Sequence, residues 1–161
     1  LSAGVVARVF LCGQCCLGYP FDLSGGEIGC VLSHRSAWMR IAEGEAVAGG
    51  VAEDDGIPQN GFDEALQLAL SGARPDRLIR MPMSNREMAA KQIAVAGVHT
   101  LVRPQVVGLK AALQILGKDA AQRLVERTED FDRRIDTFQS MTWVSGIAKV
   151  TVLLSDTHHH N

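Results

Sequence analysis

The chain is predicted to be an α/β protein with a largely parallel sheet flanked by helices, on three observations. Segments with apolar residues every three to four positions alternate with short apolar runs, which is the pattern of helices between strands. One of these runs has no polar residue, as expected of a strand buried on both faces. A length of 161 residues and a hydrophobic content of 47% suffice for one core. We therefore expect a single domain over residues 1–157.

The first element with a clear periodicity is a helix from Glu27 to Glu43, in which apolar residues recur at helical spacing. Ser24 stands where it can cap this helix, and Glu27 follows three positions later, in the order of a capping box. Gly44 stands where a helix would end. Trp38, within the helix, is expected in the core.

A buried strand is predicted next, at residues 46–52, because the run is short and entirely apolar, although two glycines within it weaken the prediction. It ends directly at Glu53, Asp54 and Asp55. Ligands of open α/β sheets bind at the carboxyl ends of strands, so this acidic triplet is a candidate site.

Further elements follow by the same criteria of periodicity and turn residues. They are a helix at 62–70 ended by Gly72, a strand at 77–81, a helix at 84–97, a strand at 99–102, a helix at 119–128 and a strand at 150–154. Strands that alternate with helices favour crossover connections, which is why a parallel sheet is expected.

Composition argues against several classes of protein. The formal net charge of -2 and the aromatic content of 5% provide neither attraction for nucleic acid nor many rings for base stacking. No apolar run approaches the roughly 18 residues of a membrane-spanning helix, and the start of the chain lacks the pattern of a signal peptide. The tail at residues 158–161 contains His158, His159 and His160, which resemble a tag remnant and are left out of any metal-site argument.

The four cysteines leave two interpretations open. Cys12, Cys15, Cys16 and Cys30 together would make a small thiolate zinc module. However, adjacent cysteines rarely share one tetrahedral ion, and no second Cys-x-x-Cys pair follows. Reduced thiols in a cytosolic protein are the interpretation that the spacing favours.

Three consecutive carboxylates after an apolar strand repel one another unless a cation or solvent relieves them. Ligand sets made only of oxygen suit Mg²⁺ or Mn²⁺, whose coordination is completed by substrate phosphates. The triplet therefore predicts a divalent ion with a nucleotide diphosphate. The alternative is an acidic turn exposed to water.

Two motifs resemble those of a known family. The run from Gly26 to His34 (GEIGCVLSH), followed after the apolar strand by Glu53, Asp54 and Asp55, resembles the paired motifs of glycosyltransferase family 25. The resemblance continues in the family's order through residues 62–70, 74–80, 107–124 and 133–138.

This resemblance implies a GT-A-like fold and the transfer of a hexose, often galactose, from a UDP-sugar to a glycan hydroxyl, as in lipopolysaccharide core synthesis. It implies a metal-dependent, inverting reaction assisted by Mn²⁺ or Mg²⁺. The partners would be the nucleotide-sugar donor and the glycan acceptor. A bacterial enzyme of this kind is expected in the cytoplasm, with peripheral contact to the inner membrane.

The resemblance also implies roles for residues. Glu53 and Asp55 are expected to bind the metal ion, and Asp136 and Glu53 are the catalytic candidates. An inverting transfer needs a carboxylate that takes the proton of the acceptor hydroxyl, while a cation offsets charge on the leaving diphosphate. The expected contacts with the donor are Glu27, His34, Asp54 and Gly108.

Some of these residues have simpler interpretations. Asp136 on the surface would pair with Arg133 or Arg134 and would then have no catalytic role. His34 would hydrogen-bond a neighbouring loop. Cys30 and His34, four positions apart on one helix, also form a conceivable zinc pair, although such pairs more often serve packing.

The family normally begins with a strand and a helix ahead of the GEIGC segment, and residues 1–19 are too few to supply both. We therefore expect the first strand-helix unit to be missing. Leu109, Leu113 and Arg134 also depart from the family's pattern. A non-catalytic remnant or interaction module that keeps the fold is the alternative to an active transferase.

Overall fold

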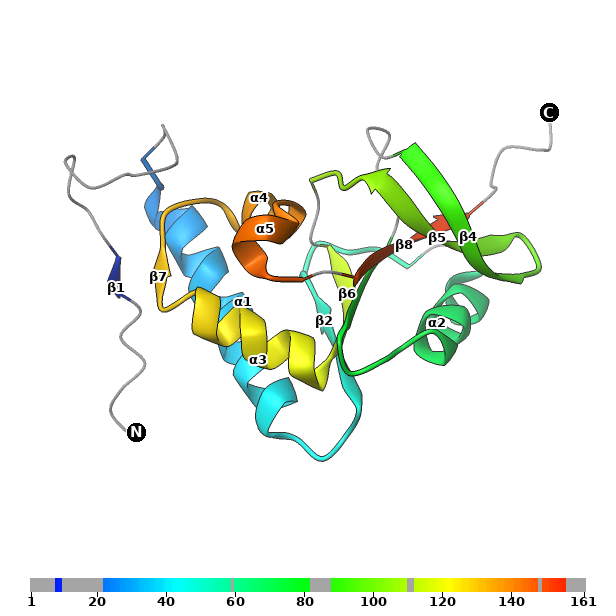
Figure 1. Ribbon diagram of the computed structural model, residues 1–161, viewed down its shortest axis with the longest axis horizontal. Helices are drawn as coiled ribbons and strands as arrows, with labels where there is room; N and C mark the ends of the chain where they lie inside the picture. Colours follow the sequence, from blue (N-terminus) through cyan, green and yellow to red (C-terminus); the bar gives the residue numbers. More distant parts are fainter. Residues whose placement is uncertain are drawn as a thin grey trace.

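The computed structural model describes residues 8–9, 22–58, 60–81, 88–109, 112–147 and 149–155. The helices are α1 (Gly25–Glu43), α2 (Phe62–Ser71), α3 (Lys118–Arg127), α4 (Ile135–Ser140) and α5 (Thr142–Ser145). The strands are β1 (Arg8–Val9), β2 (Ala48–Ala52), β3 (Arg77–Met81), β4 (Met88–Ala96), β5 (His99–Val106), β6 (Leu113–Gly117), β7 (Asp130–Phe131) and β8 (Lys149–Ser155). In Figure 1, α1, α3, α4 and α5 gather on one side of the sheet, and α2 covers the other.

The main sheet is mostly antiparallel. Its six strands lie in the order β2-β6-β3-β8-β5-β4. Among these described neighbours, only β3 and β8 run parallel. The expectation of an α/β protein with a sheet flanked by helices is confirmed, whereas the expectation of a largely parallel sheet is wrong. β1 and β7 form a separate, short parallel pair.

One incorrect helix prediction explains part of this error; β6, which was not predicted as a strand, accounts for the antiparallel pairs with β2 and β3. Within the predicted helix at 84–97, residues 88–96 form β4, and residues 84–87 lie outside the described part of the chain. Met and Ala favour a helix locally, but β4 pairs along its length with β5. Gly97, with φ of 56°, lies in the turn between the two strands. An antiparallel pair needs only such a turn, whereas a parallel pair needs a long crossover.

The other predicted elements are confirmed, with small differences in their bounds. The capping box of α1 forms as expected. The Ser24 hydroxyl accepts from the Glu27 amide at 3.3 Å, and the Glu27 carboxylate accepts from the Ser24 amide at 2.7 Å. This cap sets where α1 starts, and therefore which side chains of its first turns face the sheet.

Strand β2 forms at its predicted place, but the prediction that it is buried is wrong. It lies at the edge of the sheet and pairs only with β6 among the described strands. Val51 is buried, while the other four residues are half-buried or exposed. Gly49 has no side chain where α1 crosses, because a Cβ there would lie 2.6 Å from Ile41 Cγ1. The small residues of β2 thus let a helix approach closely.

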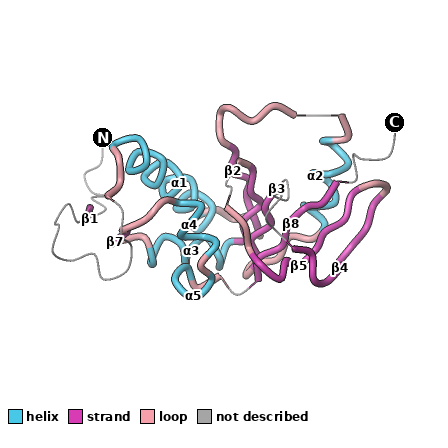
Figure 2. Tube along the Cα trace, turned by 90° about the horizontal axis from the view of Figure 1, so that it is seen from above, coloured by secondary structure: helices cyan, strands magenta, loops and turns pink. Residues whose placement is uncertain are grey.

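The core has two parts, one on each face of the sheet. Successive residues of β3 point to opposite faces, so Leu78 joins one core and Ile79 the other. The first core includes Trp38, Leu116, Leu124 and Phe138, from α1, β6, α3 and α4. The second packs α2 against the sheet through residues such as Leu68. Figure 2 shows these helices separated by the strands.

Candidate functional site

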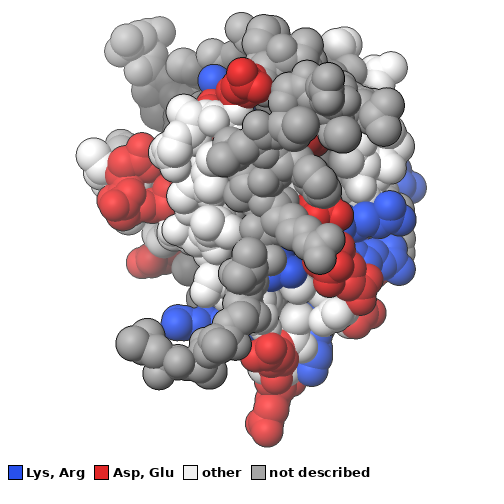
Figure 3. Space-filling view, turned by 90° about the vertical axis from the view of Figure 1, so that its left-hand side faces the viewer, with Lys and Arg blue, Asp and Glu red and all other residues white. Residues whose placement is uncertain are grey.

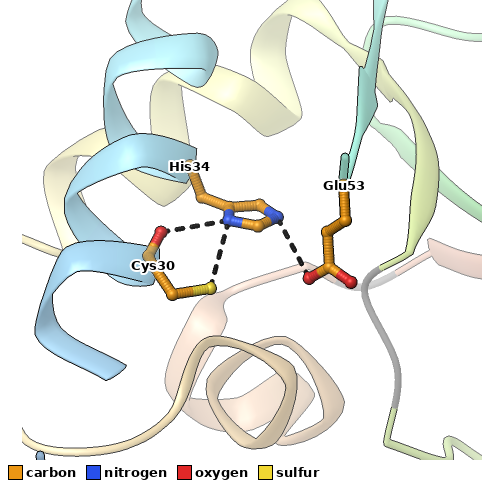
Figure 4. Close-up of side chains that lie close together, drawn as sticks. All are labelled: Cys30, His34 and Glu53. Carbon is orange, nitrogen blue, oxygen red and sulfur yellow. Dashed lines mark hydrogen bonds and ion pairs between the residues drawn. The ribbon is translucent and has the colours of Figure 1, made fainter. Parts of the chain in front are cut away.

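The residues with the clearest chemistry meet where β2 ends against α1. Cys30 and His34 stand on successive turns of α1, and Glu53 follows β2 directly (Figure 4). The two nearest atoms of His34 and Glu53, Nε2 and Oε1, are 4.0 Å apart. The Cys30 sulfur lies 3.6 Å from His34 Nδ1. One ligand atom from each of the three residues lies within 4.8 Å of the others.

The imidazole of His34 is held in one orientation. It is 5% exposed, and it packs edge-on against Trp38 with ring centroids 6.0 Å apart. Its Nδ1 lies 3.1 Å from the Cys30 carbonyl oxygen. With a proton on Nδ1 the ring donates to this carbonyl; in the other tautomer Nδ1 accepts from the Cys30 thiol. The buried Nε2, which faces Glu53, has no hydrogen-bond partner among the described residues.

Asp136 acts on the same place electrostatically. The pKa of Cys30 is raised, first by burial and then by the negative charges of Glu53 and Asp136, all of which disfavour the thiolate. Asp136 comes from the first turn of α4 and is half-buried. Its Oδ1 accepts from the Thr137 amide at 2.7 Å, which orients the carboxylate. Two acids distant in sequence, Glu53 and Asp136, therefore lie close enough to Cys30 of α1 to affect it electrostatically.

Asp136 also interacts electrostatically with Arg80, a buried arginine of β3. Burial lowers the pKa of Arg80 to about 10, and the charge of Asp136 opposes that shift. Arg80 donates to the Gly108 carbonyl at 2.5 Å, and the Ser140 hydroxyl lies 2.6 Å from the same oxygen. Gly108, predicted to contact the donor, thus lies beside Asp136 with its carbonyl already engaged.

Arg80 is a residue that sequence reasoning missed. Its signal was present, because it is the charged residue between the apolar side chains Ile79 and Met81 of a strand. An arginine inside such a strand has to be paired or functional.

The remaining predicted site residues stay at the surface. Glu27 completes the cap of α1 and forms an ion pair with Arg134. Asp54 and Asp55 lie in an exposed turn, without a hydrogen bond or ion pair to the described residues. Of the acidic triplet, only Glu53 is turned towards α1. Asp54 and Asp55 therefore fit the alternative interpretation, an acidic turn exposed to water.

Arg134 pairs with Glu27, and Arg133 contacts Asp132 through two hydrogen bonds at 2.5 and 2.8 Å. These two arginines thus have other acidic partners. The Asp136 carboxylate accepts hydrogen bonds from the amide and the hydroxyl of Thr137.

A shallow groove of about 800 Å³ lies elsewhere, between the outer face of α1 and the edge of β2. It is lined by residues such as Leu32, Ser36, Arg40, Glu45 and Gly50. None of the predicted site residues lines it, so the groove and the polar cluster are separate features. The surface seen from the α1 side carries acidic and basic side chains next to one another (Figure 3). No helix in the described part of the chain is both long and apolar enough to cross a membrane.

The fold and this cluster define an α/β protein with a polar centre at the carboxyl end of an edge strand. The chain matches the model of glycosyltransferase family 25 (LPS biosynthesis protein) over residues 19–139, which is most of its 161 residues. It therefore belongs to glycosyltransferase family 25. Membership implies a nucleotide-sugar donor and a glycan acceptor. No curated protein and no solved structure matches the chain.

The thiolate zinc module remains a prediction, because Cys12, Cys15 and Cys16 lie outside the described residues. The structure does show that Cys30 is a free, half-buried thiol whose close neighbours are an imidazole and a carboxylate.

Proposed function

We propose that the chain transfers a hexose, galactose in the expected case, from a UDP-sugar to a hydroxyl of a lipopolysaccharide core glycan. The observation that carries the proposal is that Glu53 and Asp136, two acids distant in sequence, both act electrostatically on Cys30 of α1, within a chain of this glycosyltransferase family. We place the reaction in the cytoplasm, at the inner membrane, because the glycan acceptor is built there.

Asp136 is proposed as the base of an inverting reaction. It would accept the proton of the acceptor hydroxyl while the glycosidic bond to the diphosphate breaks. Its half-buried position and the hydrogen bond from the Thr137 amide keep one carboxylate orientation. Arg80, a buried arginine of β3, interacts electrostatically with Asp136. Glu53 is the second candidate for this role.

Glu53 and Asp55 are proposed to hold Mn²⁺ or Mg²⁺ when the donor diphosphate is present. The residues fit in chemical type, because carboxylate oxygens are what these ions take, and Asp55 is exposed and available. Such an ion offsets negative charge on the leaving diphosphate. Asp54, in the same turn, would support the donor.

Contacts with the donor are proposed for three further residues. Gly108, near Asp136, would contact the donor through backbone atoms other than its carbonyl oxygen, because that oxygen already accepts a hydrogen bond from Arg80. His34 would act mainly by positioning Glu53, since its imidazole is buried. Glu27 lies at the exposed start of α1 and would reach the donor only by leaving Arg134.

The test is the thermal stability of the purified chain with Mn²⁺ and UDP. A ligand present at 100 times its Kd stabilises a protein by about 2.7 kcal/mol, which corresponds to a rise in Tm of roughly 5–10 °C at this size. We expect Asp55→Ala to abolish the rise and Glu129→Ala, an exposed acid after α3, to keep it. An unchanged Tm at millimolar ligand would favour the non-catalytic module instead.

A second measurement separates binding from transfer. Asp136→Asn should keep the rise in Tm with Mn²⁺ and UDP but lose at least about 100-fold in transfer rate, because a missing general base costs 10²–10⁴-fold. Equal transfer by Asp136→Asn and the unmodified chain would remove Asp136 from the mechanism.

A further inference from the structure

We propose that Cys30, His34 and Glu53 form a binding site for a zinc ion, which shares Glu53 with the all-oxygen site proposed for the donor's metal and adds a sulfur and a nitrogen ligand. Their ligand atoms lie within 4.8 Å of one another at the contact between α1 and the end of β2. The site does not depend on the transfer reaction, and its ligands are complete within the described chain.

The arrangement of the three side chains provides the first argument. In the tautomer with a proton on Nδ1, the ring donates to the Cys30 carbonyl at 3.1 Å and directs the lone pair of Nε2 towards Glu53 Oε1 at 4.0 Å. Nε2 has no hydrogen-bond partner among the described residues. The space between the imidazole nitrogen and the carboxylate oxygen therefore suits a positive ion.

Distances favour the ion. Zinc binds imidazole nitrogen at about 2.0–2.1 Å and carboxylate oxygen at about 2.0–2.2 Å, so one ion spans up to about 4.2 Å between them. The observed 4.0 Å lies within that span and is longer than a hydrogen bond. In a tetrahedral arrangement the ligand atoms would be about 3.4–3.6 Å apart, so they would close by about 1 Å. Rotations of the Cys30 and Glu53 side chains can supply this.

The donor set identifies the ion. Sulfur and nitrogen ligands suit zinc, whereas Mg²⁺ and Mn²⁺ take oxygen. A ligating histidine typically donates its other ring N–H to a backbone carbonyl, which fixes the ring, and His34 does this in the tautomer with a proton on Nδ1. Trp38 packs against the same ring and keeps it in place. Three protein ligands leave a fourth position for water.

The exposure of the cluster determines how a metal ion could reach the site. The Glu53 side chain is 33% exposed, so an ion can enter past it, while His34 forms the buried wall. Glu53 stands directly before the exposed turn at Asp54 and Asp55. A bound zinc ion would tie that turn to α1 and hold Glu53 in one orientation.

The experiment measures metal content and cobalt spectra in the full chain. The unmodified chain is compared with a background variant in which Cys12, Cys15 and Cys16 are changed to Ser and His158, His159 and His160 to Ala, which removes the other candidate ligands. Added Zn²⁺ should bind at one equivalent in this background. Co²⁺ should show a thiolate charge-transfer band and tetrahedral visible absorption.

Substitutions in that background identify which residues bind the zinc ion. Cys30→Ser and His34→Gln should each weaken zinc binding at least about 100-fold, because even outer partners of a metal site contribute 10–100-fold. Cys30→Ser should also remove the cobalt charge-transfer band. Asp54→Asn, a neighbouring exposed acid, should change neither. If the background variant does not fold, the Cys30→Ser difference spectrum of the otherwise unmodified chain answers the same question.

Three outcomes would overturn the proposal: no zinc binding, binding that Cys30→Ser leaves unchanged, or binding lost in the background variant alone. The result is independent of the transferase proposal, since Cys30→Ser should keep the response of Tm to Mn²⁺ and UDP, whereas Asp55→Ala should lose that response and keep zinc.

Discussion

At the scale of single residues, Glu27 connects two elements. Its carboxylate accepts from the Ser24 amide at 2.7 Å and from the Ser24 hydroxyl at 2.9 Å, and it pairs with Arg134 just before α4. The pKa of Glu27 is lowered from its ordinary 4.5, first by the backbone hydrogen bond from Ser24, then by the hydroxyl, with a smaller effect from Arg134. All of these contacts favour the ionised carboxylate over the protonated one.

This shift predicts how stability depends on pH. A folded pKa below the unfolded one adds stability above the unfolded pKa, and this stability is lost as the pH falls through the folded value. Glu27→Gln should therefore lower stability at pH 7 and make its decline below about pH 4.5 less steep. Urea midpoints between pH 3 and 7 measure this. Glu129→Gln, at an exposed position, controls for the loss of one charge; an identical pH profile for both variants would contradict the role of Glu27.

At the scale of elements, the approach of α1 to β2 depends on one missing side chain. A Cβ on Gly49 would lie 2.6 Å from Cγ1 of Ile41, a β-branched residue with little freedom to move. A Cβ on Gly50, one position later, would meet its nearest neighbour at 3.7 Å, which is ordinary contact. The same contact of α1 and β2 brings His34 to Glu53.

Gly49→Ala and Gly50→Ala form a matched pair of variants. Gly49→Ala should destabilise the chain by about 1–3 kcal/mol, the range for overpacking, while Gly50→Ala should stay within about 0.5 kcal/mol. Urea denaturation measures both. Adding Ile41→Ala should recover part of the loss from Gly49→Ala, because the clash is with that side chain. Equal effects of the two alanines would mean that α1 does not press on β2 at Gly49.

At the scale of the whole molecule, the sheet lies between two hydrophobic cores, one on each of its faces. Leu78 and Ile79 are adjacent in β3, both fully buried, and each belongs to a different core. Because one strand supplies both, loss of packing on the α2 side should loosen the side that holds Trp38. The proposed single domain over residues 1–157 implies one cooperative transition.

Ile79→Ala tests this coupling. It should destabilise the whole chain by about 2–5 kcal/mol, as expected for an emptied core position. The fluorescence transition of Trp38, on the opposite face, should shift by as much as the far-ultraviolet transition. The variant is best made with Trp143→Phe, because Trp143 is 78% exposed and would add its own signal. A Trp38 transition that stays in place would show two separate folding units.

The local part of the fold could be predicted from the sequence. The start of α1 was predicted because Ser24 and Glu27 decide it within one turn, and strand 77–81 was predicted because its burial is visible in its residues. Residues 88–96 were assigned wrongly because their pairing with β5 outweighs the helix propensity of Met and Ala. The direction of the strands was predicted wrongly for the same reason, because it depends on which strands pair and not on composition.

The candidate site could likewise be predicted only in part from the sequence. Its acids and the helix that carries Cys30 and His34 follow from the sequence, because their chemistry and their spacing on one helix are local properties. Only the tertiary structure decided that Glu53, and neither Asp54 nor Asp55, turns towards His34, and that Asp136 and Arg80 interact electrostatically. Contacts between residues far apart in the chain depend on how elements pack, and packing is decided by the whole set of buried surfaces at once.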